Sequence, residues 1–290
     1  DLRMSRGLGD VYKRQDKNPR AVPLKGAMLS HEEMEILEIS IPVKEILAKA
    51  REYGASITAY LSAVFICSIH EEIPKNRQKR PVTLMVPVNL RNFFPSESMA
   101  NFFGWIEVGY TFTETTTFQD VLEDVKKQFE EELVKEKIAM HMNGYVRLEK
   151  NPLIRAVPLE VKKYFLMVGA AWGSRRITTV YSNIGVVRFP KEYEPYIRRF
   201  GFFTCTEALQ LCSCSYGDEL LLGFTSKIPG ESIQRNFLRY LREDKISFKE
   251  ERNDFPGCQE EQKQEGKKAY QIFSFLCLTA VSYTHLTLPT

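Results

Sequence analysis

Histidine and cysteine side chains are the groups in this chain best suited to acid–base chemistry or metal binding. The four histidines are His31, His70, His141 and His285, and none of them has a second histidine at metal-ligand spacing. Cys205, Cys212 and Cys214 have six and then one intervening residues, which misses the spacing of about two to four in structural zinc sites. The sequence therefore predicts no zinc site, and it places Cys212 and Cys214 on one strand face as core or pocket lining.

Motifs for nucleophilic attack or phosphate binding are also missing from the sequence. No GxSxG elbow is present, and neither GxGxxG nor GxxxxGK[ST] follows a predicted strand. A basic loop with Lys75, Arg77, Lys79 and Arg80 has the charge to contact a phosphate, although such loops are more often simply solvated.

The composition indicates a folded chain without an obvious polyanionic partner. Of 290 residues, 43% are hydrophobic, and 40 basic against 37 acidic residues leave a net charge of +3. A dedicated nucleic-acid binder has a larger basic excess, so no nucleic-acid partner is expected. Six cysteines are too few for a disulfide scaffold, which favours a reducing, cytoplasmic location.

Hydrophobic periodicity predicts alternating helices and strands. One helix, from Gly54 to Ile69, contains no charge and is expected to be buried on most sides, and another begins at a capping box formed by Thr117 and Asp120. The strand Val82–Leu90 is continuously apolar, which is typical of a strand covered on both faces. The other expected elements are strands at 35–43, 105–113, 176–183, 204–216, 219–227 and 246–249, and helices at 42–53, 152–170 and 231–241. Gly217 and Asp218 form the predicted hairpin turn, and the order of elements favours an α/β fold with a mixed sheet over a doubly wound Rossmann domain.

Four sequence words, in this order, resemble the chloramphenicol-acetyltransferase-like acyltransferases. The words are VPVNLRNFF (86–94), ANFFGW (100–105), VYSNIGVVRFP (180–190) and SYGDELLLGFTSK (215–227). The resemblance covers about residues 35–249 and is strongest to the C-terminal half of bacterial alcohol acetyltransferases, which are related to condensation domains of nonribosomal peptide synthesis. It implies one two-layer, mixed-sheet lobe of an enzyme in which two such lobes enclose a substrate tunnel.

The resemblance also assigns roles to individual residues. It implies that Ser182 and Asn183 face the tunnel, where a hydroxyl or amide could donate to an oxyanion, although both could instead cap the strand end before Gly185. Asn101 and Phe103 are expected to line the tunnel, Tyr216 could reach it, and Arg91 is expected to be structural. The family's catalytic base belongs to an HHxxxDG motif, and no histidine in this chain is followed by aspartate at the fourth position.

The two ends of the sequence suggest a fragment. Residues 1–15 and 281–290 resemble translated sequencing adapters and are expected to be non-native, and 16–34 are expected to be a linker or a remnant of a first lobe. Residues 35–252 form the predicted lobe, followed at 253–280 by a charged linker and the apolar stretch Ala269–Ala280. That stretch is too short to cross a bilayer. It is expected to be either the stub of a membrane segment that follows residue 280 or part of a disordered tail.

The predicted function is therefore the C-terminal half of an acyltransferase that moves an acetyl or other acyl group from a thioester to a small-molecule alcohol. The donor would be acyl-CoA or acyl-pantetheine as co-substrate, with no permanently bound cofactor. The missing N-terminal lobe would be its partner, and the fragment alone would be inactive. A condensation-type module of a peptide assembly line and a non-enzymatic interaction domain remain as alternatives.

Overall fold

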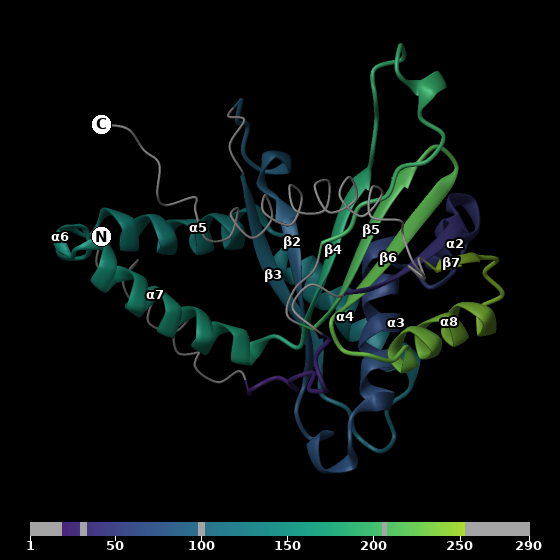
Figure 1. The fold of residues 1–290 in the computed structure, drawn as a ribbon, viewed down its shortest axis with the longest axis horizontal. Helices are drawn as coiled ribbons and strands as arrows, with labels where there is room; N and C mark the ends of the chain where they lie inside the picture. The colour runs from purple at the N-terminus through teal and green to yellow at the C-terminus, as the bar shows by residue number, and fades with distance from the viewer. Residues whose placement is uncertain (1–18, 30–33, 98–101, 205–207, 253–290) are drawn as a thin grey trace.

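One seven-stranded mixed sheet forms the centre of the protein (Figure 1). The computed structural model describes residues 19–29, 34–97, 102–204 and 208–252. The strand order is β3-β2-β4-β5-β6-β1-β7. The strands are β1 Glu35–Pro42, β2 Val82–Asn89, β3 Phe103–Tyr110, β4 Thr179–Val186, β5 Leu209–Tyr216, β6 Glu219–Ser226 and β7 Lys249–Arg252. Pairing is parallel between β2, β4 and β5 and antiparallel elsewhere, which confirms the predicted α/β fold with a mixed sheet.

One face of this sheet is covered by helices that include α3, α4 and α8 (Figure 1). The helices are α2 Val43–Glu52, α3 Ile57–Glu72, α4 Phe118–Glu132, α5 Lys135–Lys150, α6 Pro152–Ala156, α7 Leu159–Gly173 and α8 Ser232–Glu243. Helix α3 is capped by Ser56, whose hydroxyl accepts a hydrogen bond from the N–H of Ala59 at 3.1 Å, and every residue from Ala59 to Ile69 is buried. The prediction of a helix buried on most sides is confirmed.

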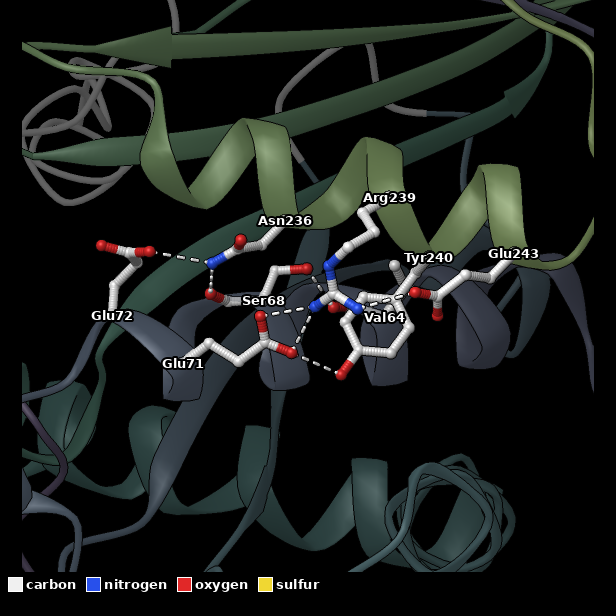
Figure 2. A network of polar contacts seen from close by, with 8 residues as sticks. All are labelled: Val64, Ser68, Glu71, Glu72, Asn236, Arg239, Tyr240 and Glu243. Carbon is white, nitrogen blue, oxygen red and sulfur yellow. Dashed lines mark hydrogen bonds and ion pairs between the residues drawn. The ribbon is translucent and has the colours of Figure 1, made fainter.

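Helix α8 is held against α3 by apolar packing and by a polar network at the rim of the contact. Phe237 is fully buried and meets Phe65 and Phe224 edge to face. In Figure 2, the Arg239 guanidinium donates to the carboxylates of Glu71 on α3 and Glu243 on α8, while the Tyr240 hydroxyl also donates to Glu71. Three contacts converge on Glu71, so the register of the two helices is fixed.

The opposite face of the sheet is only partly covered over β2, β3 and β4. Along β2, the residues facing α3, such as Val82 and Leu84, are buried, whereas Thr83, Met85 and Pro87 on the other face are half-buried. The prediction that this strand is covered on both faces is therefore wrong. Its continuous apolar sequence instead supplies one buried and one partly open face.

Helices α5, α6 and α7, which we call the arm (residues 135–173), project away from the β3 edge of the sheet (Figure 1). The predicted single helical stretch 152–170 corresponds to α6 and α7, and α5 was not expected from the sequence. Several predicted strands are shifted: β3 begins two residues earlier, β4 and β7 three residues later, and β5 five residues later than expected. The capping box of α4 and the Gly217–Asp218 hairpin are confirmed.

Residues 19–29 contact the segments that precede β2 and β4 and the residue that follows β6. Ala21 and Val22 are buried, and their N–H groups donate to the carbonyls of Arg175 and Pro81. In the described part of the chain, no single helix has the length and apolarity to cross a bilayer, and only the bent pair α2 and α3 meets those criteria together.

Candidate functional site at the carboxyl ends of the parallel strands

The three adjacent parallel strands finish at the same edge of the sheet, and the sequence words meet there. Strands β2, β4 and β5 end in Asn89, Val186 and Tyr216, and β3 begins at this edge because Phe103 pairs with Asn89. Segments far apart in the sequence thus form one end of the sheet (Figure 1). In open α/β sheets, ligands bind outside the carboxyl ends of the strands, so this edge is the candidate site.

Strands β2 and β4 separate as they approach this edge. Their ladder contains only the pairs Leu84–Thr179 and Met85–Val180, although both strands continue beyond them (Figure 1). Pro87 follows on β2 and has no N–H to donate to a neighbouring strand. The main chain of β4 from Tyr181 onward therefore has a ladder partner on β5 but, among the described residues, none on β2.

Ser182 lies in the open part of β4, beside Cys212 on β5. It is half-buried and faces away from α3, because side chains alternate along a strand and Tyr181 is buried on the α3 side. Within the described residues, its hydroxyl has no side-chain hydrogen-bond partner. A serine hydroxyl carries one donor and two acceptor sites, so Ser182 is free to bond to a ligand on the open face.

The side chain of Asn183, the next residue, makes two hydrogen bonds within the protein. Its side-chain nitrogen donates to the Thr58 hydroxyl at the start of α3 at 2.8 Å, and its side-chain oxygen accepts from the N–H of Gly185 at 2.8 Å. Gly185 has a φ of +77°, and the β4–β5 register shifts between Asn183 and Val186. Asn183 therefore fixes the strand end and its turn, and it points toward α3 and away from the open face.

Phe103 and Trp105 share the open face of β3, and both side chains are exposed. Arg91 follows β2 in a short 3-10 helix at Leu90–Asn92, where its guanidinium lies 5.9 Å from the Phe102 ring centroid. Its backbone N–H donates to the Asn89 side chain at 3.1 Å. The structural role of Arg91 remains a prediction, and Asn101 lies outside the described residues.

Tyr216 ends β5 at the hairpin turn. It is half-buried, and its ring meets Phe189 edge to face at 5.6 Å between centroids. Phe189 in turn contacts Phe200. Tyr216 is thus part of an aromatic cluster with Phe189 and Phe200. The buried Cys212 and Cys214 share one face of β5, as predicted.

A charged pair, Glu107 and Arg176, lies on the open face of the sheet. Glu107 is on β3, which is separated from β4 by β2. Glu107 is opposite Met85, which is opposite Val180, two residues before Ser182. The Glu107 carboxylate is 3.1 Å from the Arg176 guanidinium. Burial raises the pKa of Glu107, and the charges of Arg176 and His141 partly oppose that rise.

Of the two described histidines, His70 is far from Ser182, whereas His141 is near enough to Glu107 for its charge to act on that carboxylate. His70 is twelve residues beyond Thr58 on α3, about 18 Å along the helix axis, and stacks on Phe112. His141 is on α5, and His31 and His285 lie outside the described residues, as does Cys205. Within the ranges that the structure describes, no group of three His, Cys, Asp or Glu side chains is arranged to hold a metal ion.

Thr58 and Pro87 are two site residues that the sequence analysis did not single out. Thr58 lies near the start of the uncharged helix, and its position next to the α3 cap could have suggested a polar role. Pro87 lies inside one of the recognised words, where a proline in an apparent central strand signals interrupted pairing.

A sequence profile of the alcohol acetyltransferase family (AATase) matches residues 11–216. The chain therefore belongs to the alcohol acetyltransferase family. A search of curated proteins found no significant match.

Solved structures with a similar fold are distant in sequence. The nonribosomal peptide synthetase FmoA3 is 14% identical, with a TM-score of 0.55 over 80% of this chain and 23% of its own. The epimerization domain from the third module of tyrocidine synthetase B is 10% identical, with a TM-score of 0.50 over 79% and 53% of the two chains. The wax ester synthase/diacylglycerol acyltransferase from Marinobacter aquaeolei VT8 is 14% identical, with a TM-score of 0.45 over 84% and 57%. The chain thus spans between about a quarter and somewhat more than half of the length of these proteins.

Proposed function

We propose that this chain forms the acyl-binding half of an enzyme that transfers an acetyl or other acyl group from acyl-CoA or acyl-pantetheine to an alcohol. The observation that carries the proposal is Ser182, a half-buried hydroxyl without a side-chain partner in the described residues, at the open carboxyl end of β4. Membership of the alcohol acetyltransferase family supports the reaction class.

The chemistry requires a base and a donor to the oxyanion. A base takes the proton of the alcohol while the alcohol oxygen attacks the thioester carbonyl, forming a C–O bond and placing the carbonyl electron pair on oxygen. The tetrahedral intermediate then collapses, the C–S bond breaks, and the thiolate leaves with the proton that the base returns. Ser182 is proposed to donate a hydrogen bond to the oxyanion. Because this bond is stronger to the oxyanion than to the carbonyl of the bound thioester, it stabilises the transition state more than the ground state.

The base is proposed to come from a second lobe that carries the HHxxxDG motif. This lobe would lie against the open face of the sheet, where Trp105, Ile184 and Val186 expose apolar side chains around Ser182. Covering that face would also exclude water from the thioester. In this arrangement Glu107 and Arg176 lie within the enclosed face, and Asn183 keeps the β4 end in position through Thr58.

Replacement of Ser182 in the two-lobed enzyme tests this assignment. We expect Ser182→Ala to lower kcat by about 100-fold, with little change in melting temperature, because it removes one oxyanion donor without opening a core cavity. Thiol release from acetyl-CoA in the presence of an alcohol gives the rate. Ser215→Ala on β5 is the matched control, since this half-buried serine lies near the same sheet end but on the α3 face. Equal rates for Ser182→Ala and the wild type would refute the role of Ser182.

A further inference from the structure

Helix α7 carries a row of exposed apolar side chains that the proposed reaction does not use. Val161, Tyr164, Val168 and Trp172 follow each other at intervals of three, four and four residues, which places them on one helical face. Tyr164 and Trp172 are each 70% exposed, and Val168 is 60% exposed. We call these four residues the α7 stripe.

The α7 stripe differs from ordinary exposed apolar residues because its members are contiguous. Single exposed hydrophobic side chains are normal on protein surfaces, whereas a continuous patch marks a site of interaction. Tyrosine and tryptophan are also the residues enriched at the boundary between lipid and water, where one end of the side chain is apolar and the other is polar.

The charge of the arm indicates what contacts the stripe. Residues 135–173 contain seven basic and three acidic residues, a net charge of +4, whereas the whole chain has +3. Lys162 and Lys163 follow Val161 in the sequence of α7 and lie on the other side of the helix from the stripe, so the charge belongs to the arm as a whole. A second copy of the chain would bring another positive arm against this one, so the charge opposes self-association and favours an anionic partner.

We propose that the arm docks on an anionic lipid bilayer, with the α7 stripe in the headgroup region and the net positive charge of the arm attracted to the negatively charged membrane surface. Basic residues near an anionic membrane surface strengthen binding. Burial of apolar side chains in the membrane adds a hydrophobic contribution to the binding free energy. The proposal is independent of the acyl-transfer assignment.

Tryptophan fluorescence gives a direct test, because the chain has only two tryptophans, Trp105 and Trp172. In a Trp105→Phe background, the emission of Trp172 reports on α7 alone. We expect a blue shift when vesicles of phosphatidylcholine with about 30% phosphatidylglycerol are added, and a much smaller shift with pure phosphatidylcholine. Lipids with brominated acyl chains should quench this emission.

Vesicle sedimentation then separates the arm from other membrane contacts. Tyr164→Gln with Trp172→Gln should weaken binding to the anionic vesicles by about tenfold or more. Tyr193→Gln with Tyr196→Gln is the matched control, since these tyrosines are exposed on the loop after β4, outside the arm, and should bind as the wild type does. Lys162→Gln with Lys163→Gln should weaken binding to anionic vesicles only, and added salt should reduce wild-type binding.

Several results would overturn the proposal. An emission of Trp172 that is already blue-shifted without lipid would show that protein covers the stripe, and a shift that depends on protein concentration would identify a second copy as the partner. Unchanged vesicle binding of Tyr164→Gln with Trp172→Gln would place the membrane contact elsewhere, such as in the stretch Ala269–Ala280. Each of these outcomes leaves the assay of Ser182 unaffected.

Discussion

Aromatic side chains are buried on the α3–α8 side of the sheet but exposed on the arm. On the first, Phe65, Phe224 and Phe237 pack edge to face in the core, and the contacts of Arg239 with Glu71 close its rim (Figure 2). On the arm, Tyr164 and Trp172 are largely exposed. The first region is stabilised by contacts within the chain, whereas the second leaves apolar area uncovered, which is consistent with contact to something outside the described residues.

The candidate site combines a covered face and a partly open face on the same strand. Asn183 is tied to α3 on the covered face, while Ser182, its neighbour, faces the partly open side. Alternation along a single strand therefore assigns one residue to structure and the next to a proposed ligand.

The largest expected difference is between buried and exposed aromatic residues. Phe237→Ala should lower the free energy of unfolding by about 3–5 kcal/mol, because a fully buried ring is lost and a cavity remains. Trp172→Ala should change it by less than about 0.5 kcal/mol. Urea denaturation followed by circular dichroism measures both, and a cost for Trp172→Ala close to that of Phe237→Ala would contradict the comparison.

A smaller effect is expected where α3 holds the end of β4. Asn183→Ala should cost about 1–2 kcal/mol, since it removes the hydrogen bonds to Thr58 and Gly185. In a double-mutant cycle with Thr58→Val, the two costs should be less than additive because each variant breaks the same bond. Strict additivity in urea denaturation would mean that the Asn183–Thr58 bond contributes nothing.

The smallest effect is a change of stability with pH at the far end of α3. His70 stacks on Phe112 with 3.7 Å between ring centroids, and burial lowers its pKa while Glu71 partly opposes the shift. The folded state therefore disfavours the charged ring, so stability should decline as the pH falls from about 6.5 through the lowered pKa of the folded state. His70→Phe keeps the stacking and should flatten this part of the stability curve. An equally steep decline in the variant would assign the effect to other groups.

Local patterns in the sequence were sufficient for the core elements and for the family. The uncharged run that became α3, the Thr117–Asp120 capping box and the hairpin at Gly217–Asp218 depend on neighbouring residues, and all three are confirmed. Strand ends were less accurate, because they depend on pairing with distant segments. The start of β5 at Leu209, five residues after the predicted start, is one example.

The candidate site shows the same limit. The words that contain Ser182, Phe103 and Tyr216 lie at one edge of the sheet, but the sequence did not predict which face each side chain takes. The direction of Asn183 depends on Thr58, 125 residues away, and the opening between β2 and β4 depends on pairing that stops before Pro87. The α7 stripe was also not predicted, because an apolar helical segment has the same sequence pattern whether it is buried or exposed.

The most direct test of the central claim is the structure of the two-lobed enzyme with an acyl-CoA analogue whose carbonyl resists transfer. We expect the carbonyl oxygen to lie within hydrogen-bond distance of the Ser182 hydroxyl, on the sheet face opposite α3 and beside the open end of β2 and β4. A bound acyl group away from β4, with the Ser182 hydroxyl bonded only to protein, would contradict it.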